Sequence, residues 1–373
     1  MTSNIVNIDL SALRRNFRKI KSRIGFSARI LCVVKSDAYG HGMLPVAREL
    51  EAMGTDCFGI FEVEEGRTLR DGGVRTPLLV LKGIDADEIA AVTEYDLIPA
   101  VFDIDIARLL SDHALKQGKC VPVHVKVDTG MGRLGVQWQE ARSFIKGLVH
   151  LRGVQVTGIF SHLSVADEVG HSFTDVQIER FQDCVAMAHD LGIRDPVTHI
   201  ANSGAISNQK GAEGGLVRPG IMLYGSSPSA ACPGCDGLSP VMSFVSRVIQ
   251  VKTVPAGTPI SYGRRYVTKA QRIIATICAG YGDGYSRLLS NKGTVLIRGR
   301  RAPVVGTVCM NLTMADVTGI EGVSAGDEVV ILGGQKKDRI TAEEIAQQIG
   351  TISYEVYCAI GKSNRRCYLG GLS

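Results

Sequence analysis

The sequence predicts an α/β fold: a closed (β/α)8 TIM barrel followed by a mostly-β C-terminal domain. The first observation is a regular alternation of apolar strands and amphipathic helices from about residue 29 to residue 225. The second is a change of composition after that point, where short β-rich runs replace the alternation. A chain of 373 residues is long enough for two or three domains. We expect the barrel to span residues 1–230 and the β domain residues 231–373.

The barrel is predicted from eight strand candidates, most of them separated by segments with apolar residues at i, i+3 and i+4. Such alternation favours a parallel sheet with helices outside it. Eight units fit a closed barrel, and a doubly wound sheet is the alternative. The strands are expected at residues 29–35, 57–60, 77–82, 97–102, 121–128, 154–163, 197–202 and 216–224, and the clearest helices at 44–53, 104–117 and 175–191.

The second domain is predicted to begin after a linker at residues 226–240, which is rich in Ser, Pro and Gly. Beyond it, turn residues separate β-rich runs at 241–254, 272–279, 293–298, 302–310 and 328–332, as in a mostly-β domain. One short helix follows. Thr341 and Glu344 form a capping box before Ile345 and mark the start of that helix.

The composition excludes several classes of protein. Hydrophobic residues make up 45% of the chain and charged residues 21%, which is typical of a globular protein. The net charge of +5 is too small to indicate nucleic-acid binding. No apolar run is long enough to span a membrane, and the N-terminus lacks a signal-peptide pattern, so we expect a cytoplasmic protein.

The ten cysteines are scattered, which fits free thiols in a reducing cytoplasm. Only Cys232 and Cys235 are close together, in the sequence CPGC. A redox pair is expected at a helix N-terminus after a strand, and a zinc site needs a second cysteine pair. Neither context is present. We therefore expect no metal site and interpret this segment as a flexible connection that holds two thiols.

Polar residues follow the strands at the positions where a barrel carries its functional groups. In this fold those groups sit at the carboxyl ends of the strands. Five strand ends would then present a reactive or anion-binding group to one face of the barrel. The residues are Lys35, Arg133, His162, Ser203, and Arg218 with Gly220.

These residues lie in motifs that resemble the alanine racemases dependent on pyridoxal phosphate (PLP). Eight motifs follow the family's order over nearly the whole chain. They are VVKSDAYGHG at 33–42, HVKVDTGMGRLG at 124–135, HIANSGA at 199–205, VRPGIMLYG at 217–225, SYG at 261–263, GYGDGY at 280–285, VCMN at 308–311 and TISYE at 351–355. The resemblance implies a homodimer that interconverts L-alanine and D-alanine by two-base proton transfer at Cα, supplying D-alanine for peptidoglycan.

By this resemblance Lys35 carries PLP as a Schiff base. An amine attacks the cofactor aldehyde only when it is unprotonated, so nearby cations and burial should lower the pKa of Lys35. The resemblance also implies a phosphate site built from hydroxyls and backbone N–H groups. Its residues would be Tyr39, Ser203, Gly220, Ile221 and Tyr354.

Arg218 would face the pyridine nitrogen of the cofactor. A guanidinium stays charged and cannot accept a proton from the ring. The ring nitrogen then stays unprotonated, and the cofactor is a weaker electron sink. An arginine at this position should therefore limit side reactions such as transamination.

The second base implied by the family is Tyr262. A tyrosine with a pKa near 10 is a poor base at neutral pH, so we expect His162 and Arg218 to stabilise its phenolate. Tyr262 lies in the β domain, which in the family reaches the partner's barrel in a head-to-tail dimer. Tyr281 matches a residue that lines the substrate entrance, again across the dimer. The resemblance thus implies active sites shared between two chains.

The substrate carboxylate would be received by Arg133 and by the backbone at Met310, since a guanidinium binds a carboxylate through two parallel hydrogen bonds. Lys126 matches a lysine that is often carbamylated in the family. An unmodified lysine beside Arg133 would repel it, so carbamylation makes electrostatic sense.

Two departures leave alternatives open. The family commonly has CMDQ where this chain has CMNL, so Asn311 and Leu312 bear on the substrate range. One alternative is a broader racemase acting on serine or larger amino acids. The other is a non-catalytic PLP-binding protein like the small PLP-homeostasis family, which has the barrel alone.

The GMGRLG sequence at 130–135 resembles a dinucleotide-binding motif. It lacks the acidic residue expected about 20 residues later, so we do not expect a nucleotide site there.

Overall fold

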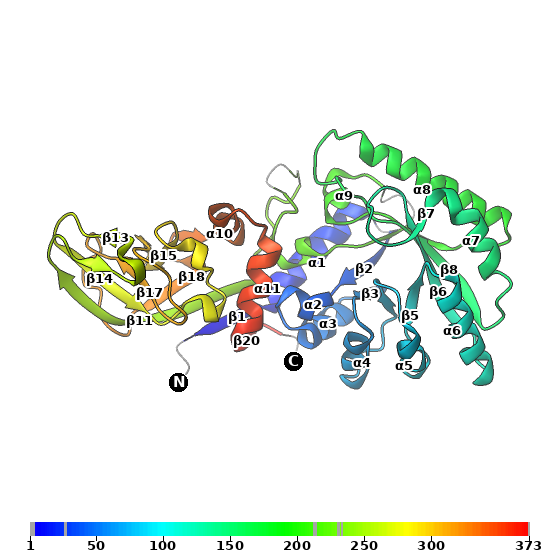
Figure 1. The fold of residues 1–373 in the computed structure, drawn as a ribbon, viewed down its shortest axis with the longest axis horizontal. Helices are drawn as coiled ribbons and strands as arrows, with labels where there is room; N and C mark the ends of the chain where they lie inside the picture. Colours follow the sequence, from blue (N-terminus) through cyan, green and yellow to red (C-terminus); the bar gives the residue numbers. More distant parts are fainter. Residues whose placement is uncertain (1–3, 26–27, 212–214, 230–231, 233, 372–373) are drawn as a thin grey trace.

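The computed structural model describes residues 4–25, 28–211, 215–229, 232 and 234–371. A parallel barrel and a mostly-β domain lie side by side along the longest axis of the molecule (Figure 1). The predicted fold class is therefore confirmed. Among the described residues, no helix is both long and apolar enough to span a membrane.

The barrel sheet has the strand order β10-β2-β3-β4-β5-β6-β8-β9, and every neighbouring pair is parallel. The ring closes through a single bridge between Asn202 and Arg218. A doubly wound sheet would reverse its strand order at a switch point, and the described strands show no such reversal. The strands are β2 (Arg29–Val33), β3 (Cys57–Ile60), β4 (Leu78–Val80), β5 (Ile98–Val101), β6 (Val121–Asp128), β8 (Val154–Phe160), β9 (Val197–His199) and β10 (Leu216–Val217), with β7 (Val136–Gln137) beside β6.

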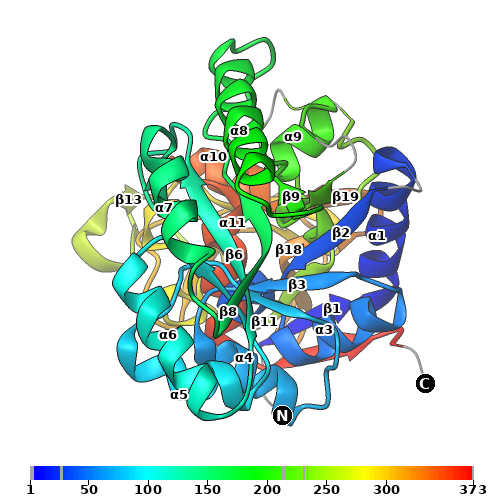
Figure 2. The ribbon, with the colours of Figure 1, turned by 90° about the vertical axis from the view of Figure 1, so that its right-hand side faces the viewer.

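Helices surround these strands, as the view in Figure 2 shows. The first, α1 (Leu10–Ile24), was missed by the sequence analysis although Leu13, Phe17 and Ile20 give it a buried face at helical spacing. It begins at Asp9, whose carboxylate accepts a hydrogen bond from the Ala12 N–H at 3.0 Å. The others are α3 (Met43–Ala52), α4 (Val63–Asp71), α5 (Ile89–Glu94), α6 (Ile104–Lys116), α7 (Ala141–Leu148), α8 (Phe173–Asp190) and α9 (Ser203–Asn208).

The β domain contains the first strand of the chain. β1 (Ile5–Asp9) pairs antiparallel with β11 (Met242–Val254) and parallel with β20 (Arg366–Leu369). We assigned residues 1–230 to the barrel, yet β1 belongs to the sheet of the other domain. The predicted boundary between residues 230 and 231 lies outside the described residues. The remaining strands are β12 (Pro259–Ile260), β13 (Tyr266–Val267), β14 (Arg272–Ile277), β15 (Thr294–Ile297), β16 (Arg300–Pro303), β17 (Thr313–Asp316), β18 (Glu328–Gln335) and β19 (Asp338–Ile340).

Several predicted strands are shorter than expected, and two of them end much earlier. The segment predicted at 216–224 leaves β10 after Val217 and ends in a 3₁₀ turn, Ile221–Tyr224. The segment predicted at 302–310 leaves β16 after Pro303 and continues as a loop to Met310. Both differences place candidate site residues on loops rather than within strands.

Two helices lie between the domains. α10 (Ala342–Ile349) starts at Thr341, whose hydroxyl accepts from the Glu344 N–H at 3.1 Å as the capping box predicts. The Glu344 carboxylate instead bonds Arg301. α11 (Ser353–Ser363) packs closely on the segment after β2. A Cβ placed on Gly361 would lie 1.9 Å from the carbonyl oxygen of Gly40, so only glycine permits this approach.

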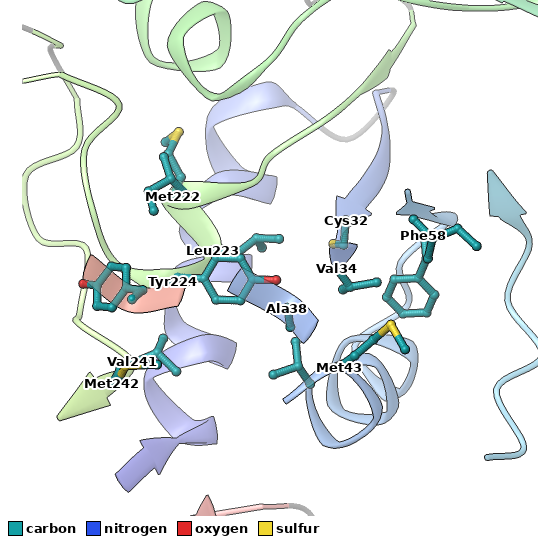
Figure 3. Packing of buried hydrophobic residues seen from close by; sticks show 14 of the residues in the cluster. Cys32, Val34, Ala38, Met43, Phe58, Met222, Leu223, Tyr224, Val241 and Met242 are labelled. Carbon is teal, nitrogen blue, oxygen red and sulfur yellow. The ribbon is translucent and has the colours of Figure 1, made fainter. Parts of the chain in front are cut away.

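The core connects the first barrel strand to the last barrel turn (Figure 3). Tyr224 is fully buried, and its hydroxyl donates to the carbonyl of Val33 at 2.9 Å. Val34 and Ala38 pack in the same cluster. This packing fixes the position of Lys35, which lies between them in the chain.

Candidate active site

Lys35 opens a left-handed turn, α2 (Lys35–Tyr39). Ser36, Asp37, Ala38 and Tyr39 all have φ of +54°. For an L-residue this conformation costs roughly 1–2 kcal/mol. Four consecutive non-glycine residues therefore need strong external support.

Hydrogen bonds from three directions supply that support. Asp37 accepts from the Met43 N–H at 2.7 Å and forms an ion pair with Arg366. The Nδ1 of His41 lies 3.0 Å from each of two carbonyl oxygens of the turn, so this nitrogen carries the proton and donates. Burial lowers the pKa of His41 to about 3, which keeps the ring neutral. The turn is thus held by a neutral donor inside and an ion pair outside.

The Lys35 side chain lies half-buried at the mouth of the barrel. Its Nζ is 5.3 Å from the centre of the Phe61 ring. Burial lowers the pKa of Lys35, and the nearby charge of Arg133 lowers it further, while Glu65 acts in the opposite direction. Burial and the Arg133 charge thus favour the neutral amine of Lys35, which is the nucleophilic form.

Lys126, on β6, is a second amine near Lys35. Its Nζ donates to the carbonyl of Leu81 at 3.2 Å and lies 5.3 Å from the centre of the Phe160 ring. Burial lowers its pKa to about 7, with further contributions from Arg218, Arg133 and Lys35. Two amines and two guanidinium groups therefore lie near one another at one end of the barrel, an arrangement suited to anionic ligands.

The loop before Arg133 turns around a single carboxylate. Asp128 is buried, and its Oδ1 accepts from the backbone N–H groups of Gly130, Met131 and Gly132 at 2.9, 2.9 and 3.1 Å. Both glycines have positive φ. The glycines of GMGRLG therefore serve a tight loop that carries Arg133, which explains the resemblance to a dinucleotide motif.

Arg218 is 4% exposed and donates hydrogen bonds in several directions. Nη1 reaches the carbonyl of His199 at 2.8 Å and its Nδ1 at 3.0 Å, whereas Nη2 reaches the carbonyl of Ser161 at 2.6 Å and Nδ1 of His162 at 3.2 Å. Burial lowers the pKa of Arg218 to about 9, which still leaves it charged at neutral pH. Because a guanidinium only donates, both imidazoles accept through Nδ1 and carry their proton on Nε2.

The sequence analysis missed the roles of His124 and His199. The Nε2 of His199 lies 2.8 Å from Nδ1 of His124, so the hydrogen-bond direction set by Arg218 continues to a third buried residue. Burial and then the Arg218 charge hold the pKa of His199 well below its usual value. The sequence did offer one indication of these roles, because His124 and His199 are the first residues of two of the motifs quoted above.

The residues predicted to hold a phosphate lie together on the side of the barrel near α11. The Gly220 N–H donates to Ser203 Oγ at 2.9 Å. A Cβ on Gly220 would lie 2.5 Å from the Tyr39 hydroxyl, so glycine leaves the room this group needs. The rings of Tyr39 and Tyr354 have centroids 5.8 Å apart, and Ile221 begins the buried turn that follows.

The three candidate site residues of the β domain form a separate exposed cluster. They are Tyr262, Tyr281 and Met310. Thr307 Oγ1 donates to the Tyr262 carbonyl at 2.8 Å, and the Tyr281 N–H donates to Cys309 at 3.0 Å, next to Met310. The Tyr262 side chain is 73% exposed. Figure 1 shows β13, just after Tyr262 in the chain, far along the molecule from β2 and from α2, the turn that begins at Lys35. One chain therefore does not bring Tyr262 to its own Lys35.

Comparison with known proteins gives a consistent result. The family model described as alanine racemase, N-terminal domain, matches residues 8–228, and the one described as alanine racemase, C-terminal domain, matches 241–368. An alanine racemase of Syntrophobacter fumaroxidans is 47% identical, with 100% of this chain and 99% of the relative covered. The solved alanine racemase of Streptomyces lavendulae has a TM-score of 0.94 at 35% identity, covering 100% and 98% of the two chains. The alanine racemase of Bartonella henselae, solved with covalently bound pyridoxal phosphate, has a TM-score of 0.88 at 28% identity, covering 99% and 100%.

Proposed function

The chain belongs to the alanine racemase family, and on that premise we propose that it interconverts L-alanine and D-alanine with PLP as its cofactor. The observation that carries this proposal is the position of Lys35. A half-buried amine with a lowered pKa lies at the barrel mouth, among cations that suit an anionic cofactor and an amino-acid carboxylate.

The residues present fit PLP. The Gly220 N–H and the hydroxyls of Tyr39 and Ser203 lie together and can donate to a phosphate group, and the buried Arg218 offers a charged donor. When bound, PLP withdraws electrons from the substrate and so makes the proton on Cα acidic. Lys35 would hold the cofactor, and Tyr39, Ser203, Gly220, Ile221 and Tyr354 would bind its phosphate.

Racemisation needs a proton acceptor on each face of Cα. We assign the Nζ of Lys35 to one face and the Oη of a partner's tyrosine, equivalent to Tyr262, to the other. His162 supports this assignment because Arg218 occupies its Nδ1 and leaves a proton on Nε2. That N–H can donate to a phenolate oxygen and so favour the basic form of the tyrosine.

A homodimer with shared sites follows from this assignment. Tyr262, Tyr281 and Met310 leave exposed apolar surface at one edge of the β domain, and such surface commonly marks an interface. Covering the partner's barrel mouth would bury this edge and exclude water from the cofactor.

Arg133 and the Met310 backbone would receive the substrate carboxylate. For Lys126 we propose carbamylation. With a pKa of about 7, a large share of this amine is neutral at neutral pH and can react with carbon dioxide. The product is an anion, which would attract Arg133 where the unmodified cation repels it.

Alanine is favoured over larger substrates because Tyr262, Tyr354 and Met310 would crowd the methyl group. Asn311 and Leu312 are both exposed next to Met310, so they bear on the broader, serine-accepting alternative. The non-catalytic alternative has no second domain, whereas this chain has one that matches the family. A cytoplasmic location remains our expectation and fits ten free thiols.

The experiment is a panel of L-amino acids incubated with purified protein and scored for D-product. We expect D-alanine as the main product, a trace of D-serine and no D-lysine. Lys35→Ala should abolish the reaction and the covalent attachment of PLP after borohydride reduction. Lysine turnover comparable to alanine would overturn the proposed specificity, and a covalent adduct retained in Lys35→Ala would overturn the assignment of Lys35.

A further inference from the structure

The CPGC pair of the linker has a more defined environment than its sequence indicated. Cys232 and Cys235 are the only two of the ten cysteines within four residues of each other, and all ten are free thiols. Their segment packs against α1: the Asn16 side chain exchanges hydrogen bonds of 2.8 Å with the backbone of Ser239 in both directions. The thiols therefore lie in a segment anchored to the barrel.

The two thiols contact each other and differ in their surroundings. Cys232 is 8% exposed and donates a hydrogen bond to the half-buried Cys235. The Sγ of Cys235 also lies 3.5 Å from Ser207 Oγ on α9, whereas the Ser227 hydroxyl donates to the carbonyl of Ser229 at 2.6 Å. Cys235 is thus both the more accessible sulfur and the one within hydrogen-bonding distance of a hydroxyl.

Two cations of α1 face the same turn. A Cβ on Gly234 would lie 2.1 Å from Nη1 of Arg23, so the guanidinium rests directly against Gly234, the residue before Cys235. The Arg23 Nε donates to the carbonyl of Ile206 at 3.1 Å, which fixes its position. A Cβ on Gly237 would similarly lie 2.7 Å from the amine of Lys19. These glycines allow positive charge to approach the cysteines.

This environment stabilises a thiolate at one cysteine only. The hydrogen bond from Cys232, with smaller contributions from Ser227, Ser207 and Arg23, lowers the pKa of Cys235 to about 6 against the opposing effect of burial. The pKa of Cys232 is raised, first by the same hydrogen bond and then by burial, with Asp167 the nearby carboxylate. A nucleophilic sulfur therefore lies beside a protonated one.

We propose that Cys235 and Cys232 form a thiol–disulfide exchange site for a low-molecular-weight disulfide, with Cys235 as the attacking thiolate and Cys232 as the resolving thiol. The Cys235 thiolate bonds to one sulfur of the external disulfide, whose S–S bond breaks and releases one thiolate. Cys232 then attacks Cys235 Sγ, gives its proton to the second departing thiolate, and completes the protein disulfide. The first released thiolate takes up from solvent the proton that Cys235 lost on ionising. In sum one external disulfide becomes two thiols, and the two protein thiols, with their two hydrogens lost, become one disulfide.

The pair lies close to the proposed phosphate site. The charges of Asp167, Cys232 and Cys235 all act on Tyr354 and raise its pKa after burial does so. Ser207 belongs to the helix that starts at Ser203. Oxidation removes the thiolate charge at this position.

The first test compares alkylation of Cys235 with that of Cys120, an exposed thiol elsewhere on the barrel. At pH 6 a thiol with a pKa of about 6 is half ionised, whereas an ordinary thiol is well under 1% ionised. After allowance for its lower intrinsic nucleophilicity, Cys235 should react with iodoacetamide about tenfold faster. Peptide mapping of the full-length protein gives both rates. A Cys235 rate no greater than that of Cys120 would overturn the proposal.

The second test uses glutathione disulfide and a pair of matched variants. Wild type and Cys120→Ser should lose two hydrogens by intact mass and yield a peptide linking the two cysteines. Cys232→Ser keeps a hydrogen-bond donor, so its alkylation midpoint should stay near pH 6 while the reaction stops with one bound glutathione. Cys232→Ala should raise that midpoint. A persistent glutathione adduct on Cys235 of the wild type, or equal midpoints in the two Cys232 variants, would contradict the assigned roles.

Discussion

The barrel mouth and the exposed edge of the β domain are built in opposite ways. At the barrel mouth, Lys35 and Arg218 are held by hydrogen bonds, packing and buried charge within one chain. At the β-domain edge, Tyr262 and Met310 are solvent-exposed side chains with a well-connected backbone. This difference supports the proposal that one chain builds the cofactor half of the site and that a partner chain supplies the second half.

The largest expected effect tests whether the two regions meet across a dimer. Lys35→Ala and Tyr262→Phe should each lower racemase activity by at least 10²-fold, the usual contribution of a general base. Co-expression gives about half mixed dimers, and each mixed dimer has one intact site if the sites are shared. Activity should then recover to about a quarter of wild type.

The matched control for this complementation is co-expression of Lys35→Ala with Arg218→Lys, which both lie in the barrel. Every mixed dimer then carries one lesion at each site, so activity should not recover beyond that of Arg218→Lys alone. Failure of Lys35→Ala and Tyr262→Phe to complement would place Tyr262 in its own chain's site.

Arg218→Lys tests how strongly the barrel half depends on one donor set. Lysine keeps the charge but offers three donors from one nitrogen, so it cannot reach both imidazoles and the surrounding carbonyls together. Leaving buried acceptors unpaired should cost about 1–3 kcal/mol of folding free energy. We expect a lower urea midpoint and slower racemisation, both measurable on the purified protein. An unchanged urea midpoint would mean that the Arg218 hydrogen-bond network does not contribute to folding stability.

The pH dependence of stability should reflect His41, which supports the left-handed turn. Its folded pKa of about 3 lies below the ordinary value, so the unfolded chain binds more protons between the two pKa values. Stability is then fully present above pH 6.5 and falls as the pH drops toward 3. His41→Gln should reduce the slope of unfolding free energy against pH by about one proton, or about 1.4 kcal/mol per pH unit, between pH 6 and 5. Parallel curves for the two proteins would contradict a buried neutral His41.

The smallest expected effect concerns the backbone of the turn itself. Ser36 is exposed with φ of +54°, a conformation that glycine adopts without a steric cost. Ser36→Gly should therefore raise the unfolding free energy by up to about 1 kcal/mol. The control is Ser22→Gly on α1. Glycine within this right-handed helix should lower the unfolding free energy by a similar amount. Urea denaturation measures both, and changes of the same sign would exclude the strain argument.

The sequence predicted what depends on local periodicity and missed what depends on distant contacts. The barrel strands alternate with helices, and β3 and β6 were placed at their observed bounds. β1 was missed because its partners lie more than two hundred residues away. The left-handed turn after Lys35 could not be predicted, because contacts of Asp37, His41 and Arg366 hold its non-glycine residues in that conformation. Buried histidines such as His199 look like ordinary core residues until the donors around them are known.

The pairing of β1 also bears on the order in which the parts of the chain fold during synthesis. β1 leaves the ribosome first, yet its neighbours β11 and β20 are made only at residues 242–254 and 366–369. The eight barrel units, with their short-range connections, are all synthesised while β1 has no strand to join. Because domains generally fold as units in the order of synthesis, the barrel should assemble before the opening strand is paired. β1 would then be joined to β20 last, so that this sheet is completed only after β20 has been made.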